Sequence, residues 1–219
     1  MSDAPDRWVC LDVGETLIDE TRIWSVWADV LGIPRLTLMA ALGAMIARGT
    51  EHGSVFGVFG LGEADWRALI PKVEERYGGF QERDLYPDAR DAIMALTGAG
   101  YRLAILANQP ASRSAELRAL GIAAEVLAMS DELGVAKPAP AFFARALELM
   151  GGPDPADVAY VGDRVDNDVL PSLAAGMRSV WIRRGPWGFL QSPPPDRQPA
   201  LTIESLSELT DRVGEAWPR

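Results

Sequence analysis

Short apolar runs recur along the chain and predict the strands of a buried parallel sheet. Each run carries little internal charge and ends beside a polar residue or a glycine, as strands buried on both faces do. The runs cover residues 7–12, 102–107, 124–129, 157–161 and 178–182, and a last short run covers 200–203. Helix-like stretches lie between them at 88–97, 112–120, 139–150 and 166–175, and another at 205–213 closes the chain. This alternation predicts an α/β, Rossmann-like parallel sheet with helices on both faces.

One long segment interrupts the alternation. Between residues 21 and 83 no stretch has the pattern of a strand, whereas 23–31, 36–47 and 63–77 have the pattern of helices. We therefore expect a small all-helical cap inserted after the first strand, with hinges near 17–19 and 85–87. The expected core domain covers 1–18 and 85–219, and the expected cap domain covers 19–84. The Gly- and Pro-containing stretch 183–199 is expected to be a loop.

Composition narrows the classes of partner. The chain has 219 residues, of which 48% are hydrophobic, and a formal charge of -10. That charge argues against nucleic acid as a partner, because phosphate backbones are bound by Lys and Arg. The longest stretch without a charged residue or His covers 36–47, which is shorter than a membrane-spanning helix, and the polar start MSDAPDR does not fit a signal peptide. A single cysteine excludes an internal disulfide. We expect a cytoplasmic monomer or homodimer with no membrane partner.

Acidic side chains follow two of the predicted strands. Asp12 ends the first strand, Asp163 follows the fourth, and Asp168 comes five residues later. Ligands of open parallel sheets bind at the carboxyl ends of the strands. Carboxylates gathered there suit Mg²⁺, a hard cation that prefers oxygen ligands, and Lys137 before a predicted helix is a second cation for the group.

The ordered set of these motifs is more specific than any one of them. An Asp-led loop at Asp12, a strand ending near Asn108, Lys137 followed by proline, and GDRVDND, which contains Asp163 and Asp168, before an AAGM turn occur in this order. Together they resemble the haloacid dehalogenase-like hydrolase superfamily, over about residues 8–182. In this family the cap is inserted between the first and second motifs, where the helical segment lies here.

The resemblance implies a phosphatase mechanism with Mg²⁺. Asp12 would be the nucleophile that forms an aspartyl-phosphate with a small phosphorylated substrate. Asp12, the Gly14 carbonyl and Asp163 would hold the metal, and Asp168 would orient the metal shell or Lys137. Lys137 would neutralise charge on the nucleophile and on the phosphoryl group.

Two positions depart from the family pattern. The first motif of the phosphatases reads Asp-x-Asp, and its second Asp protonates the leaving group, but here Gly14 stands in that place. Glu15 is then either a stand-in acid or a residue bonded within the loop. The second motif ends in Ser or Thr in the family and in Ala107 here. Phosphoryl binding is therefore expected from the Ala107–Asn108 segment, through the backbone amides of Asn108 and Gln109 or the Asn108 side chain, together with Lys137.

These departures leave alternatives to a phosphatase. One is a weakly active or non-catalytic relative that binds phosphate or another ligand. The other is a dehalogenase- or phosphonatase-type hydrolase of C–X or C–P bonds, which the intact Asp163 motif disfavours because metal-free dehalogenases lack it. In the cap, Trp24 and Trp27 lie three residues apart and either line the cleft or pack between helices. His52, in a Gly-rich stretch, is expected to be exposed.

Overall fold

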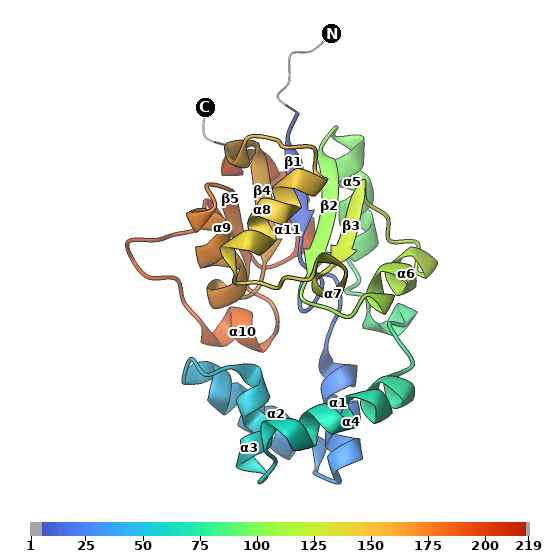
Figure 1. Cartoon of the computed structure of the whole chain (residues 1–219). Coiled ribbons are helices and arrows are strands. Elements are labelled where there is room, and N and C mark those ends of the chain that lie inside the picture. Colours follow the sequence, from blue (N-terminus) through green and yellow to red (C-terminus); the bar gives the residue numbers. More distant parts are fainter. Residues whose placement is uncertain (1–5, 218–219) are drawn as a thin grey trace.

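The computed structural model describes residues 6–217 and contains the predicted parallel sheet (Figure 1). Six strands pair in the order β3-β2-β1-β4-β5-β6, and every neighbouring pair is parallel. Their bounds are β1 Trp8–Leu11, β2 Arg102–Ala107, β3 Val126–Met129, β4 Val158–Gly162, β5 Arg178–Ile182 and β6 Leu201–Ile203. The α/β Rossmann-like class is thus confirmed.

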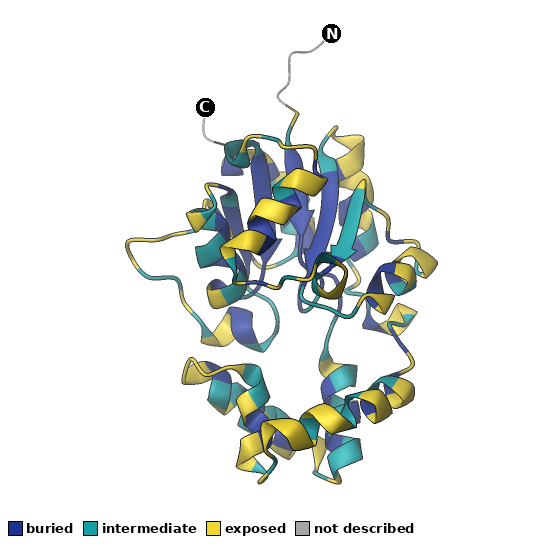
Figure 2. Ribbon diagram, in the orientation of Figure 1, coloured by how far each residue is buried: buried dark blue, intermediate teal, exposed yellow. Residues whose placement is uncertain are grey.

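Both faces of the sheet are apolar and covered by helices, as the unbroken hydrophobic runs require. In β1, Val9 and Leu11 pack into one cluster with α5 and α11, while Trp8 and Cys10 pack into the other with α8. Figure 2 shows the central strands as buried, the edge strand β3 as intermediate, and the outer faces of the helices as exposed. The core helices are α5 Ala89–Gly98, α6 Ser112–Ala119, α7 Ser130–Leu133, α8 Pro140–Leu149, α9 Leu170–Ala174, α10 Gly185–Leu190 and α11 Leu206–Arg212.

The segment between β1 and α5 is helical, as expected, and lies beyond the carboxyl ends of the strands (Figure 1). It contains α1 Thr21–Leu31, α2 Arg35–Ala47, α3 Val55–Val58 and α4 Glu63–Tyr77. Short turns of helix cover His52–Ser54, Glu82–Asp84, Pro155–Asp157, Val165–Val169 and Val213–Ala216. The cap helices bury their own apolar cluster, which includes Trp24, Leu38, Leu42 and Phe56.

The two chain segments that lead into and out of the cap run side by side. Asp19 N donates to Asp84 O at 2.7 Å, Tyr86 N donates to Leu17 O at 2.9 Å, and Ile18 forms an antiparallel bridge with Leu85. We place the proposed boundary between core and cap at this pair of linkers.

The expectation that residues 183–199 form a loop is wrong in part. The stretch after β5 is not all loop, because α10 begins at Gly185 with Pro186 in its first turn, where proline fits a helix. Trp187 of this helix joins the apolar cluster of the cap, so α10 packs the core against the cap.

Within the described residues no single helix is both long and apolar enough to span a bilayer. By length and composition α1 and α2 pass that test only as a pair, and they are bent by 115° at their junction.

Candidate active site

Three strand ends place the predicted residues together. Because β2 and β4 are the neighbours of β1, the residues that follow these strands share one edge of the sheet. Asp12 follows β1, Asn108 follows β2 and Asp163 follows β4. The chain direction after β1 is set by Val13, whose carbonyl accepts from the backbone N–H groups of Leu17 and Ile18 and so closes the loop.

Lys137 lies between two of the carboxylates. Its Nζ is 2.8 Å from Asp12 Oδ1 and 2.6 Å from Asp168 Oδ1, and all three side chains are buried. Burial alone would lower the pKa of Lys137, but the two carboxylates raise it above its usual value, so the ammonium stays charged.

Asn108 holds Lys137 in place rather than facing the cavity with its amide. Its Nδ2 donates to Lys137 O at 2.8 Å, and its Oδ1 accepts from Lys137 N at 2.8 Å. The Asn108 side chain is therefore occupied by the backbone of the lysine loop. Of the two expected donors to a phosphoryl group in this segment, the backbone is the one that remains, and Ala107 contributes no hydroxyl.

The three acids form a cluster suited to a cation. One oxygen each of Asp12, Asp163 and Asp168 lies within 4.8 Å of the others. Asp163 Oδ2 is buried and has no hydrogen-bond partner among the described residues. Burial, followed by the charges of Asp168 and Asp12, raises the pKa of Asp163 well above its usual range. A buried carboxylate oxygen without a partner, facing two other acids, fits Mg²⁺, because a hard divalent cation supplies the missing partner and offsets the repulsion.

Asp168 is bonded on both oxygens. Oδ1 accepts from Lys137 Nζ and Oδ2 accepts from Arg164 N at 2.9 Å. Burial raises the pKa of Asp168 to about 6, against the lowering effect of Lys137. This arrangement fits the role of orienting Lys137, one of the two that the family resemblance implies.

Both carboxyl oxygens of Glu15 accept hydrogen bonds. It has a positive φ of 50°, its Oε1 accepts from Glu20 N at 3.0 Å, and its Oε2 accepts from the Tyr86 hydroxyl. Burial, with the charge of Glu20, raises the pKa of Glu15 to about 7. Of the two interpretations offered for Glu15, these contacts favour the residue bonded within the loop.

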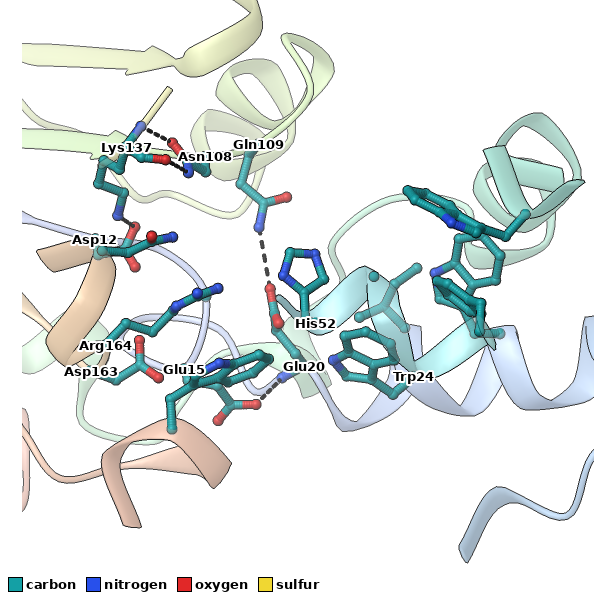
Figure 3. Close-up of a pocket in the computed structure, with 18 residues that line it drawn as sticks. Asp12, Glu15, Glu20, Trp24, His52, Asn108, Gln109, Lys137, Asp163 and Arg164 are labelled. Atoms are coloured by element: carbon teal, nitrogen blue, oxygen red, sulfur yellow. Dashed lines mark hydrogen bonds and ion pairs between the residues drawn. The ribbon is translucent and has the colours of Figure 1, made fainter. Parts of the chain in front are cut away.

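Glu20 was not singled out from the sequence. It precedes α1, and its Oε1 accepts from Gln109 Nε2 at 3.2 Å, so its carboxyl bridges the cap entrance and the loop after β2 (Figure 3). Burial, with the nearby charge of Asp12, raises the pKa of Glu20. A single acidic residue in a linker forms no motif, so no pattern in the sequence indicated a role for Glu20.

A cavity of about 260 Å³ joins these groups to the cap. Its core side carries Asp12, Lys137, Asp163 and Arg164, and its cap side is largely aromatic (Figure 3). The aromatic side chains that line it are Trp24, Trp27, His52, Phe56, Trp66 and Trp187.

His52 belongs to this wall, so the expectation that it is exposed is wrong. Its ring lies half-buried, 6.2 Å from the ring of Trp24 and 6.2 Å from that of Trp187. Burial, followed by the charge of Arg164, lowers the pKa of His52. Trp24 and Trp27 fulfil both alternatives, since they line the cavity and pack with the other cap residues.

The chain is similar to one family model and to individual proteins of known name. A family model described as haloacid dehalogenase-like hydrolase matches residues 7–176. A phosphoserine phosphatase of Thermus thermophilus is 34% identical over 200 residues, which cover 84% of this chain and 76% of that protein. A glyceraldehyde 3-phosphate phosphatase of Methanopyrus kandleri is 35% identical over 133 residues, and the chain spans 57% of its length, with 59% of this chain matched.

The fold has solved counterparts as well. The structure of the putative HAD-hydrolase YfnB from Bacillus subtilis, bound to magnesium, matches with a TM-score of 0.73. The match covers 94% of this chain and 98% of that one at 20% identity, so it supports the fold alone.

Proposed function

We propose, starting from the fact that the chain belongs to the haloacid dehalogenase-like hydrolase family, that it is a Mg²⁺-dependent phosphatase of small phosphorylated metabolites. The observation that carries this proposal is the position of Asp12. Asp12 directly follows the central strand β1. Its Oδ1 lies 2.8 Å from Lys137 Nζ, and its side chain lines the cavity together with Asp163. The names of the two relatives, both phosphatases, agree with this choice.

In the proposed reaction Asp12 is the nucleophile. An Oδ atom of Asp12 attacks phosphorus and forms an aspartyl-phosphate as the bond to the leaving oxygen breaks, and water later releases inorganic phosphate. Lys137 lies against Asp12 and offsets the repulsion between the carboxylate and the phosphoryl oxygens. Asp168 holds Lys137 in this position, and the Ala107–Asn108 backbone and Lys137 bind the phosphoryl group.

Asp12, Asp163 and the Gly14 carbonyl are the proposed ligands of Mg²⁺, with Asp168 beside them. When bound, the ion supplies positive charge that stabilises the phosphoryl oxygens in the transition state. The aromatic cap side of the cavity keeps bulk water from the acyl-phosphate.

A screen against phosphate monoesters with Mg²⁺ tests the proposal. We expect turnover that is lost on Asp12→Asn, and a covalent phosphoenzyme that the same variant cannot form. Mass spectrometry after acid quench detects that adduct. Turnover that survives Asp12→Asn contradicts the assigned nucleophile. No turnover of any ester, with phosphate still bound, identifies the chain as a binding relative instead, an outcome that Ala107 in place of a hydroxyl residue favours.

A further inference from the structure

The space beside Gly14 is filled by a carboxyl group from another part of the chain. A Cβ built on Gly14 would lie 2.5 Å from Glu20 Oε1 and 3.0 Å from Glu20 Cδ. Standard bond lengths place the carboxylate oxygens of an aspartate about 2.4 Å from its own Cβ. Glu20 Oε1 therefore lies at about the distance from this Cβ position at which a carboxylate oxygen of an aspartate at position 14 would lie.

Independent contacts hold Glu20 in this place. Gln109, in the loop after β2, donates to Glu20 Oε1, and the Glu20 backbone N–H is bound by Glu15. Both Glu20 and Asp12 line the same cavity. Figure 3 shows Gln109 and Glu20 pointing toward one another across the cavity, with Asp12 and Lys137 on the core side.

We propose that Glu20 performs the proton transfers for which position 14 has no side chain; this rests on the proposed phosphatase function. As the bond from Asp12 Oδ to phosphorus forms, the bond from phosphorus to the leaving oxygen breaks and its electron pair stays on that oxygen. The Glu20 carboxyl group gives its proton to this oxygen and becomes a carboxylate. In the second step the carboxylate takes a proton from water, whose oxygen bonds to phosphorus as the Asp12–phosphorus bond breaks.

Glu20→Gln tests this role with two substrates of similar size, benzyl phosphate and p-nitrophenyl phosphate. The benzyl alcohol leaves poorly without a proton, whereas nitrophenolate leaves readily. Because kcat/KM reports steps up to departure of the leaving group, we expect it to fall about 10²–10⁴-fold for benzyl phosphate and less than about 10-fold for p-nitrophenyl phosphate. With the second ester, slow attack of water on the phosphoenzyme should produce a burst of nitrophenol.

Two further variants separate proton transfer from structure. Glu15→Gln removes a neighbouring buried carboxyl group but keeps a side-chain oxygen that can accept from Glu20 N, so it should not change the ratio of the two kcat/KM values. In Glu20→Ala, adding Gly14→Asp returns a carboxyl group to the site, and we expect it to restore the benzyl ester selectively. Equal losses for both esters in Glu20→Gln, or a selective loss in Glu15→Gln, would overturn the inference. If the wild-type protein hydrolyses neither these esters nor any other, the proposed function itself fails.

A different observation bears on the substrate. The charged side chains that line the cavity, Asp12, Glu15, Glu20, Lys137, Asp163 and Arg164, come from the core or its linker to α1. The cap contributes aromatic rings: Phe56 is stacked on Trp66 at 5.1 Å, and Trp27 lies 4.6 Å from Phe56. Among the described residues the cap helices α1 to α4 offer no charged side chain to this cavity.

We infer that the organic part of the substrate is a planar or aromatic group, rather than an amino acid or a polyol. A carboxylate entering this wall would lose its hydration without meeting a positive charge, and a polyol would bury most of its hydroxyls against ring faces, whereas an aromatic ring buries apolar surface and stacks. Arg164 does not supply the missing charge, since it is paired with Asp166 at 2.7 Å and lies over the Trp187 ring at 5.0 Å.

Benzyl phosphate, phosphoserine and glycerol 3-phosphate test this inference because all three release an alcohol. We expect kcat/KM for benzyl phosphate to exceed the other two by at least about 10-fold. Trp66→Ala should raise KM for benzyl phosphate about 10-fold and leave the constants for glycerol 3-phosphate unchanged. Phe189→Ala, which removes an exposed aromatic ring outside the cavity, is the matched control. A preference for phosphoserine, or an unchanged KM in Trp66→Ala, overturns the inference.

Discussion

Replacing Lys137 with methionine measures what the buried ammonium contributes to the fold. Methionine keeps an unbranched side chain of similar length in the same space, so the main change is the loss of charge. In the protein Lys137 Nζ lies 2.8 Å from Asp12 and 2.6 Å from Asp168, and Asp163 completes the acid cluster. Without the ammonium these carboxylates face one another with no cation between them.

The expected cost follows from that geometry. Removing one partner of a buried ion pair destabilises a protein by about 3–5 kcal/mol, because the other charge stays buried and unpaired. The cost should apply at pH 7 without Mg²⁺, above the pKa of about 6 of Asp168. It should shrink at pH 5, because Asp168, with a pKa raised to about 6, then takes up a proton. Mg²⁺ at 100 times its Kd should stabilise either protein by about 2.7 kcal/mol, so the cost falls only as far as the variant, without the competing ammonium, binds the ion more tightly than the wild type.

Urea unfolding followed by circular dichroism, at pH 5 and 7 with EDTA or Mg²⁺, measures these differences. Lys72→Met is the matched control, since Lys72 is exposed on α4 and its loss should change the free energy of unfolding by less than about 0.5 kcal/mol. The reasoning is refuted if Lys137→Met is as stable as the Lys72→Met control at pH 7 in EDTA. It is also refuted if the cost increases when the pH is lowered to 5.

Three further predictions concern other buried charges. Mg²⁺ should raise the Tm of the wild-type protein but not that of Asp163→Asn, which loses a proposed ligand, as thermal unfolding with increasing Mg²⁺ will show. The pKa of Glu15 is raised to about 7, so the folded state holds its proton more tightly and stability should fall as pH rises from about 4.5 to 7; Glu15→Gln should remove that part of the pH dependence of urea unfolding. Asp84→Asn should cost about 2 kcal/mol in the same assay, because it weakens the bonds of Asp84 with Arg22 across the cap linker.

The strands and the acids at their ends could be predicted from the sequence because both are local features. The run 102–107 is apolar after its first residue, and its side chains are stabilised by burial on both faces of a sheet, so its pattern predicts a buried strand. Parallel strands then bring their carboxyl ends to one edge, which gathers Asp12 and Asp163 however the loops are built. The order of motifs added Lys137, and the structure places its ammonium between Asp12 and Asp168.

Other features depended on how distant segments pack. Glu20 reaches the space beside Gly14 because the linker turns into α1 and Gln109 binds its carboxyl group, and neither event is encoded in the spacing of the two residues. The ring of His52 lies beside that of Trp187 in the cavity wall, because α10, which is far from the cap in the sequence, packs against it. Side-chain direction and the meeting of separate elements are tertiary properties, so a periodic pattern could locate the cap helices but not the surfaces that they turn toward the acids.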